Sequence, residues 1–211
     1  MNPYNIINFI ASKRPEQYSK DKIYQISDLL PIPIDNAYED ENGLQGKWKT
    51  KTDIFTYKNG IKNGPYESYH GGTTTKGSYL NGIKDGEFTI YRRDHTINTK
   101  AFLKDGKLNG YWYSYYQNGQ IHDKVLYKDD KYNGPYETYY ENGQLTCRKH
   151  YINDKLNGPY ETYYPDGNPY KISYYENDRL EGFSTYFGPD GEIRSRIIYQ
   201  SGFEKNGEFF T

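Results

Sequence analysis

A glycine recurs at nearly constant spacing along most of the chain, and this spacing limits the fold more than any other feature. It opens a block that reads Asn-Gly-Pro-Tyr in its clearest copies, and it stands at Gly64, Gly86, Gly110, Gly134, Gly158, Gly182 and Gly207. The successive intervals are 22, 24, 24, 24, 24 and 25 residues. Because a fixed period of this length is typical of tandem repeats, we predict an array of about seven copies of one unit.

Each copy contains two turn signals, with short segments rich in Tyr, Thr and Ile between them. The first signal is an Asn-Gly or Asp-Gly pair, found at Asn118-Gly119, Asn142-Gly143, Asp166-Gly167 and Asp190-Gly191. These pairs are preferred in two-residue type I′ turns, so we predict a tight hairpin at each of them. A looser turn is expected in the polar stretch before the next opening glycine. Stacked copies predict a mostly β protein, an elongated single-layer antiparallel β-meander of tandem hairpins.

A two-residue loop at Asn142-Gly143 also predicts a register for the hairpin around it. It places Tyr140 opposite Leu145, Thr138 opposite Cys147, Tyr136 opposite Lys149 and Gly134 opposite Tyr151. The same count places Tyr127, Tyr175 and Tyr199 opposite Gly110, Gly158 and Gly182. A tyrosine ring over a strand glycine fills the space of the missing side chain. We therefore interpret two sets as structural, the glycines Gly86, Gly110, Gly134, Gly158 and Gly182 and the tyrosines Tyr127, Tyr151, Tyr175 and Tyr199.

The composition suits a thin structure and excludes several classes of partner. The chain has 211 residues, a net charge of -1 and 27 tyrosines, and tyrosine can bury its ring while its hydroxyl stays in water. The balanced charge gives no electrostatic reason to bind nucleic acid or anionic membranes. No apolar run approaches a membrane span and nothing reads as a signal peptide, so we expect no transmembrane segment and a cytoplasmic location.

Residues 1–43 do not follow the repeat, and we assign residues 44–211 to the array. Asn2-Pro3 is a favourable helix start, and the apolar stripe that follows predicts a short helix to about Lys13. A second stripe, from Ile23 to Leu30, predicts another helix before Pro31. Repeat arrays need caps at their ends, so we predict a partly helical N-terminal cap. Whether this segment caps the array or contacts a partner is left open.

We find no pattern that supports catalysis or metal binding. The four histidines lie 6, 9, 12 and 16 residues after their opening glycines, so they occupy different places on the sheet and do not form a ligand cluster. Cys147 is the only cysteine, and we interpret it as a small structural side chain. No phosphate-binding loop or paired nucleophile and base is present. We predict no catalytic residue, no metal site, no cofactor and no enzymatic activity.

The repeat resembles MORN repeats, and most closely the bacterial-type second class found in YwqK-family antitoxin-like proteins. Residues 110–121, Gly-Tyr-Trp-Tyr-Ser-Tyr-Tyr-Gln-Asn-Gly-Gln-Ile, followed by Tyr127, carry the pattern, which extends over about residues 46–211. The resemblance implies a twisted sheet with an aromatic-lined groove and an adaptor or binding role. The units at 64–109 depart from the pattern, with Gly71-Gly72 and Arg93-Asp94-His95 in place of the Asn-Gly turn. We therefore expect specialised contacts there.

Two tyrosine-rich columns are the candidates for binding a partner. They contain Trp112, Tyr136 and Tyr160 in one column and Tyr115, Tyr139 and Tyr163 in the other. Stacking within the sheet explains such columns equally well, but Tyr and Trp are also frequent at binding hot spots. We predict a protein-binding repeat module, with an antitoxin- or immunity-type neutraliser as its specific form. The alternatives are a structural scaffold or self-associating adaptor, with homo-oligomers, and binding of glycans or a lipid surface.

Overall fold

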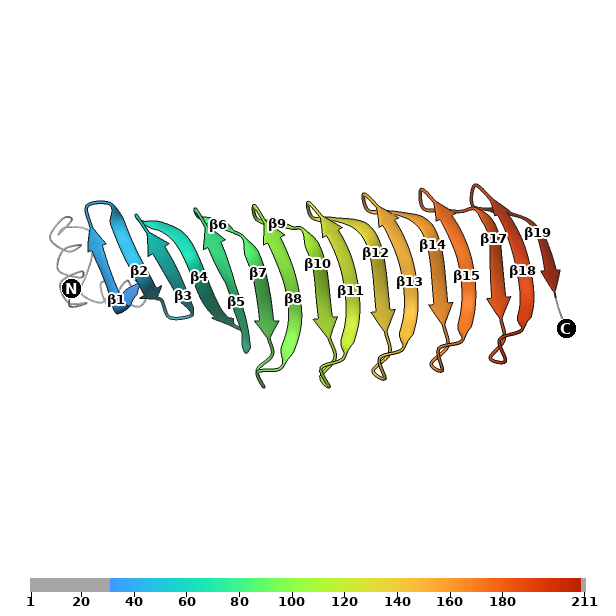
Figure 1. Ribbon diagram of the computed structural model, residues 1–211, viewed down its shortest axis with the longest axis horizontal. Coiled ribbons are helices and arrows are strands. Elements are labelled where there is room, and N and C mark those ends of the chain that lie inside the picture. The colour runs from blue at the N-terminus through green and yellow to red at the C-terminus, as the bar shows by residue number, and fades with distance from the viewer. Residues whose placement is uncertain (1–30, 210–211) are drawn as a thin grey trace, which may run out of the picture. The chain divides into compact units, whose positions relative to one another are not determined.

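The computed structural model describes residues 31–209, and within this range it contains strands and turns and no helix. The predicted helices at residues 2–13 and 23–30 lie outside the described residues. The chain divides into two compact units, residues 1–86 and 87–211. The strands of each unit follow one another as hairpins (Figure 1).

Unit 1 contains six strands that pair antiparallel in chain order. They are β1 (Ile32–Asp40), β2 (Gly43–Lys49), β3 (Asp53–Lys58), β4 (Ile61–His70), β5 (Thr73–Leu80) and β6 (Ile83–Lys84). Trp48, Phe55 and Tyr66 pair across β2, β3 and β4, and Trp48 and Tyr66 are 2% and 4% exposed. Aromatic rings therefore form the core of this unit. Strand β1 lies in the segment that we predicted to be outside the repeats, so strand pairing begins before residue 44.

Unit 2 continues the same alternation of strands and turns. Its strands are β7 (Gly86–Tyr91, beginning on the last residue of unit 1), β8 (Ile97–Lys104), β9 (Lys107–Leu108), β10 (Gly110–Tyr115), β11 (Ile121–Lys128), β12 (Lys131–Tyr139), β13 (Leu145–Ile152), β14 (Lys155–Tyr163), β15 (Pro169–Glu176), β16 (Arg179–Leu180), β17 (Gly182–Phe187), β18 (Ile193–Gln200) and β19 (Phe203–Phe209). From β8 onward, neighbouring strands of this unit pair antiparallel. Both units have the predicted fold class, an antiparallel β-meander of hairpins.

The predicted type I′ turn at Asn142-Gly143 is wrong. The Tyr140 N–H donates to the Gln144 carbonyl at 2.8 Å, and the Gly143 N–H donates to the Tyr140 carbonyl at 2.8 Å. Of the three loop residues 141–143, Gly143 alone has a positive φ, of 83°. This is a three-residue loop, a type I turn closed by a left-handed glycine. The Asn142 side chain accepts a hydrogen bond from the Gln144 N–H, which stabilises the turn without a left-handed asparagine.

The two-residue type I′ turns occur at the opposite ends of the strands, in the stretches that we expected to be looser. Asn153 and Asp154 have φ values of 49° and 68°, and they lie between the paired residues Ile152 and Lys155. Asp129-Asp130 and Asn177-Asp178 have the same geometry. Asn and Asp tolerate the left-handed region because their side chains hydrogen-bond to nearby backbone. In these turns Asp154 also accepts from the Tyr132 N–H of the preceding hairpin at 2.7 Å.

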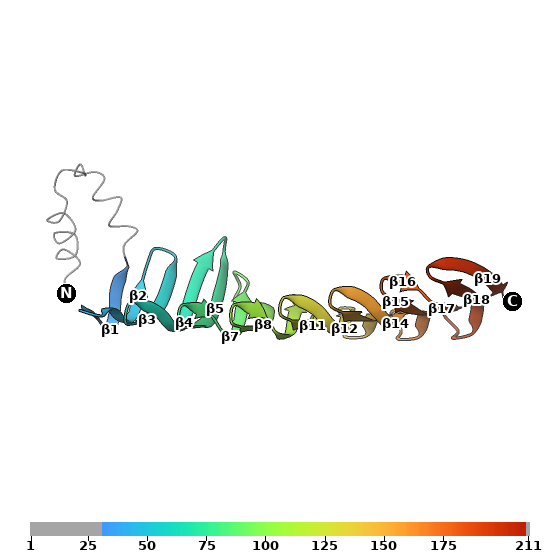
Figure 2. The ribbon, with the colours of Figure 1, turned by 90° about the horizontal axis from the view of Figure 1, so that it is seen from above.

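The register of the β12–β13 hairpin agrees with the prediction except beside the loop. Gly134 pairs with Tyr151, Tyr136 with Lys149 and Thr138 with Cys147, whereas Leu145 pairs with Tyr139 and not with Tyr140. The loop is one residue longer than predicted, and a one-residue bulge between Leu145 and Cys147 compensates for it. Bulges recur at this place in successive hairpins. They increase local bending, and the strands of unit 2 curve along their length (Figure 2).

The opening glycine recurs for a different reason from the one that we predicted. Gly134 lies in a second bulge, where its φ of 134° is rarely open to other residues. A side chain there would also lie 2.6 Å from the Leu126 Cδ2 atom of the neighbouring strand. Tyr151 is opposite Gly134 as expected, but backbone conformation and the approach of Leu126 are what require glycine.

Unit 2 has one closely packed face and one more open face. We call face one the face that carries Val125, Ser173 and Ser184, which are 2%, 2% and 0% exposed. Over it lie the rings of Tyr127, Tyr132, Tyr136 and Tyr151, with centroids 5.0 to 6.2 Å apart. Face two carries Lys124, Glu137, Arg148 and Glu161, which are paired across successive strands. The single layer thus buries small side chains beneath tyrosines on face one.

Candidate interaction surface

A row of alternating charges crosses face two of unit 2, with Glu137 at its centre. The Glu137 carboxylate accepts from Lys124 Nζ at 3.0 Å and from Arg148 Nε at 3.0 Å. Arg148 also lies 3.5 Å from Glu161. Burial raises the pKa of Glu137, but hydrogen bonds from Lys124, Tyr139 and Arg148 outweigh it and hold the pKa below its usual value. The row therefore stays charged at neutral pH and fixes its side chains in one arrangement.

The predicted column Tyr115, Tyr139 and Tyr163 lies on face two beside this row. The Tyr139 hydroxyl donates to Glu137 at 2.9 Å, and the Tyr163 hydroxyl donates to Glu161 at 2.6 Å. The Tyr115 ring instead packs on Tyr113, with centroids 6.4 Å apart. Two of these three tyrosines therefore orient carboxylates, and Tyr115 differs from them.

The predicted column Trp112, Tyr136 and Tyr160 lies on face one. Trp112 and Tyr136 both pair with Val125, one from each side. Burial raises the pKa of Tyr136 and of Tyr160 to about 12. The two predicted columns are therefore on opposite faces of unit 2, and one partner surface lying flat on the sheet cannot contact both.

A set of exposed aromatic side chains on face two was not among our predicted site residues. We call it the aromatic strip, and it consists of two sets separated by β11 to β14, Phe102 and Tyr111, which are 44% and 38% exposed, and Tyr174 and Phe183, which are 49% and 55% exposed. Tyr111 and Phe183 directly follow an opening glycine, and Tyr174 directly precedes one of the tyrosines opposite it. Because neighbours in a strand point to opposite faces, this adjacency could have identified them from the sequence.

Tyrosine hydroxyls connect three hairpins of unit 2 to the next hairpin at the loop end. Tyr116, Tyr140 and Tyr164 donate to the carbonyls of Tyr139, Tyr163 and Phe187 at 2.7, 3.1 and 3.0 Å. Arg92 takes the equivalent position in the first hairpin, 24 residues before Tyr116. Its guanidinium donates to the carbonyls of Tyr115 and Ile97, so an arginine replaces the tyrosine contact there.

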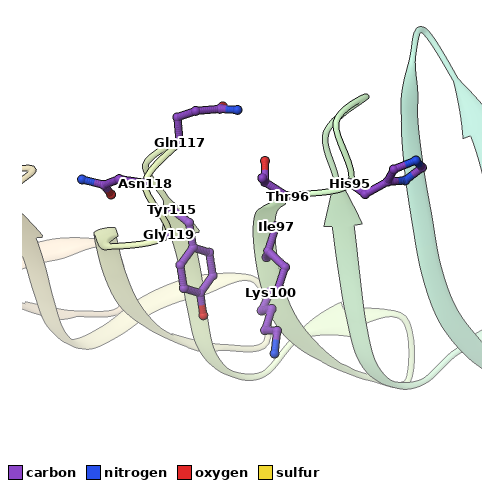
Figure 3. A pocket seen from close by; sticks show the side chains of 8 residues that line it. All are labelled: His95, Thr96, Ile97, Lys100, Tyr115, Gln117, Asn118 and Gly119. Atoms are coloured by element: carbon purple, nitrogen blue, oxygen red, sulfur yellow. The ribbon is translucent and has the colours of Figure 1, made fainter.

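A shallow pocket lies beside this arginine, in the irregular part of the repeat where we expected specialised contacts. Its volume is about 460 Å³, and it is lined by His95, Thr96, Ile97, Lys100, Tyr115, Gln117, Asn118 and Gly119 (Figure 3). The Gln117 amide donates to Asp94, which joins the two loops at the rim. Lys100 and Tyr115 extend in the same direction from neighbouring strands (Figure 3).

The other groups considered for chemistry are scattered or protected. Among residues 31–209, no group of three or more His, Cys, Asp or Glu side chains could hold a metal ion. Burial, as the largest influence, raises the pKa of Cys147, so its thiol stays protonated and weakly reactive at neutral pH. Between residues 31 and 209 there is also no helix with the length and hydropathy to cross a membrane.

Comparison with known proteins finds the MORN repeat variant in unit 2. Three tandem stretches match it, residues 108–129, 132–153 and 156–177. Each match begins two residues before an opening glycine and ends in a type I′ turn. No curated protein matches the chain.

Similarity to solved structures is weak. An S. aureus TarM variant in complex with Fondaparinux, alpha-GlcNAc-glycerol and UDP is 11% identical over 74% of this chain and 27% of its own, with a TM-score of 0.21. A second structure of TarM is 13% identical over 73% and 26%, with a TM-score of 0.20. This chain spans about a quarter of the length of those proteins, and such scores carry no argument about fold or function.

Proposed function

We propose that this chain is a non-enzymatic binding module that holds a protein partner on face two of unit 2, with its MORN-type repeats as the frame. The aromatic strip is the observation that carries the proposal. Four large aromatic side chains on one face are each more than a third exposed. Exposed apolar patches commonly mark interaction surfaces, and aromatic residues supply much of the binding energy there.

The charged row supports the proposal because it makes face two rigid before any partner arrives. Glu137 and Glu161 are each held by an arginine and a tyrosine. The Lys124 ammonium lies 5.0 Å from the Tyr111 ring centroid, and the Arg196 guanidinium lies 5.5 Å from that of Phe183. A surface that is ordered in advance loses less conformational entropy on binding. On face one, tyrosines already cover the buried small side chains and leave less apolar area for a partner.

The specific form that we favour is an antitoxin- or immunity-type neutraliser acting in the cytoplasm. The resemblance to the second MORN class motivates it. Co-expression of this chain with a toxin encoded beside it should restore growth. A captured partner that keeps its full activity in the complex would refute neutralisation and leave the binding role intact.

Affinity capture with quantitative mass spectrometry tests the binding role. The double variant Tyr174→Ser/Phe183→Ser should recover at least about tenfold less partner than wild type, since hot-spot aromatics typically contribute more than 1 kcal/mol each. Phe209→Ser is the matched control, because Phe209 is 81% exposed and lies on face one. Circular dichroism checks that every variant is folded. Equal recovery with the double variant and the control would refute binding through the strip.

Self-association is a second candidate, which the exposure of β19 favours. Every residue of this strand is exposed, including Phe203 at 73% and Phe209 at 81%. An exposed strand can pair with another chain. Sedimentation velocity should then show dimers that Phe203→Lys removes, whereas a monomer at high concentration would exclude this candidate.

A further inference from the structure

The pocket in unit 2 contains an ammonium group that has no counter-ion. Lys100 lies in β8 directly opposite Tyr113, and it lines the pocket. Within the described part of the chain, Lys100 forms no ion pair and no hydrogen bond through its side chain. An unpaired cation beside a concave surface is suited to attract an anionic group.

Three of the other four cations in this position of the repeat are neutralised, and the fourth, Arg196, forms no ion pair among the described residues and lies over the Phe183 ring. Lys124 is 3.0 Å from Glu137, and Arg148 is shared between Glu137 and Glu161. In unit 1, Lys76 is 3.0 Å from Glu67. All three carboxylates come from the third residue after an opening glycine, and Thr89 and Tyr113 occupy that place in the two copies around Lys100. The copies on both sides of the pocket thus lack the acid that would neutralise Lys100.

Among the other pocket residues, Tyr115 extends in the direction of Lys100 and adds a hydroxyl (Figure 3). The Gln117 and Asn118 amides donate to Asp94 and to the Glu141 carbonyl, and the His95 ring points away from Lys100 (Figure 3). The nearby carboxylate of Asp94 accepts from Thr96 and Gln117 and does not line the pocket. Burial raises the pKa of Tyr115, and the charge of Glu87 adds to this rise. Glu87 does not line the pocket and forms no ion pair with Lys100. A volume of about 460 Å³ is enough for one side chain with its flanking backbone.

We infer that this pocket receives an aspartate or glutamate side chain from an acidic segment of the protein partner, with Lys100 as its counter-ion. This inference rests on the proposed binding function and specifies the chemistry of the partner. Phe102 lies two residues from Lys100 on the same strand and face, so the acidic residue would be adjacent to one that contacts the aromatic strip. Charge complementarity of this kind selects the partner and sets its orientation.

A titration of the labelled full chain with a capped tetraglutamate peptide tests the inference. The amide resonances of Ile97 and Gly119 should shift, because both residues line the pocket. Lys100→Gln should weaken binding about threefold to fivefold, the range expected for a partly exposed ion pair. Lys104→Gln is the matched control, since Lys104 lies in the same strand outside the pocket and should bind as the wild type does.

A second pair of variants separates charge from shape. Tyr113→Glu places a carboxylate opposite Lys100, as Glu137 is placed opposite Lys124, and should abolish binding of the peptide. Tyr113→Gln removes the same ring without adding charge and should bind at least about threefold more tightly than Tyr113→Glu.

Three results would overturn the inference: equal affinity of Lys100→Gln and wild type, equal binding of a tetraglutamine peptide, or inorganic phosphate binding as tightly as tetraglutamate. The last result would identify a site for small anions. Partner capture separates these failures from failure of the proposed function. If Lys100→Gln captures the partner normally while Tyr174→Ser/Phe183→Ser does not, the binding role stands and only the acidic contact is refuted.

Discussion

Replacing Glu137 with Gln tests whether one buried carboxylate organises face two. The Glu137 side chain is 10% exposed, and its oxygens accept from Lys124 and Arg148 at 3.0 Å and from Tyr139 at 2.9 Å. Glutamine keeps nearly the same shape and removes the charge. Lys124 and Arg148 would then face a neutral amide, and one of its two polar ends is a donor that repels them.

The size of the effect follows from how far water can reach the two cations. Removing one partner of a fully buried ion pair costs about 3–5 kcal/mol. The side chains of Lys124 and Arg148 are 29% and 47% exposed, so solvent compensates for part of this loss. We expect Glu137→Gln to lower the free energy of unfolding of unit 2 by about 1.5–3 kcal/mol.

Glu161→Gln is the matched comparison in the next hairpin. Glu161 is 23% exposed, lies 3.5 Å from Arg148 and has no second cation within ion-pair distance among residues 31–209. We expect a loss of about 0.5–1 kcal/mol. The two variants change the same atoms at equivalent positions. The difference between their losses in free energy of unfolding therefore measures the effect of deeper burial and of the second cation at Glu137.

Urea unfolding followed by tryptophan fluorescence measures both variants. The chain has two tryptophans, so a Trp48→Phe background leaves Trp112 to report on unit 2. The pKa of Glu137 lies below 4.5 in the folded state, so its contribution is complete above that pH and disappears as the pH falls through the folded value. The difference in the free energy of unfolding between wild type and Glu137→Gln should therefore decrease as the pH falls through this value. A loss no larger than that of Glu161→Gln at pH 7 would refute the reasoning.

Three further predictions concern the frame of unit 2. Gly134→Ala should cost about 1–3 kcal/mol in urea unfolding, because its φ is 134° and the new Cβ would meet Leu126; stability equal to wild type would contradict the bulge. Tyr140→Phe removes the hydrogen bond to the Tyr163 carbonyl and should cost about 1 kcal/mol, with faster amide exchange at that turn and not at distant ones. Burial raises the pKa of Tyr136 to about 12 from 10.0, so its contribution to stability is complete below pH 10 and is lost toward pH 12; the difference in absorbance at 295 nm between wild type and Tyr136→Phe should appear well above pH 10, and a difference that appears near pH 10 would argue against burial of Tyr136.

The predicted register was nearly complete, although the turn that supported it was wrong. A two-residue loop and a three-residue loop with one bulge give the same pairing of Thr138 with Cys147, because the extra loop residue and the bulge cancel. Pairing arithmetic on the sequence cannot separate these two solutions. The consecutive Asn-Asp and Asp-Asp pairs at residues 129–130, 153–154 and 177–178 could have indicated the type I′ turns, since both residue types tolerate positive φ.

The candidate site depended more strongly on the structure. Alternation along a strand places Trp112 and Tyr115 on different faces of the sheet, but it does not show which of the two faces is closely packed with side chains. That depends on Ser173, Ser184 and the tyrosines that cover them. The pocket had a signal in the sequence, since Arg92 stands where a tyrosine recurs and Thr89 and Tyr113 stand where glutamate recurs. Only the structure shows that Tyr113 is the residue opposite Lys100, and therefore that Lys100 has no glutamate across from it there.

The sequence by itself determined the repeat, the antiparallel meander and most of the strand register, because spacing and turn chemistry are local properties of the chain. The tertiary structure showed which loop is tight, why the opening glycine is required, how exposed each aromatic residue is and that Lys100 lacks the carboxylate partner that Lys124 has. Each of these depends on neighbours that lie one or two hairpins away, about 10 to 24 residues along the chain, and bulges shift those neighbours by single residues. A shift of one residue moves a side chain to the other face, so contacts across the sheet carry the information about function that spacing alone does not contain.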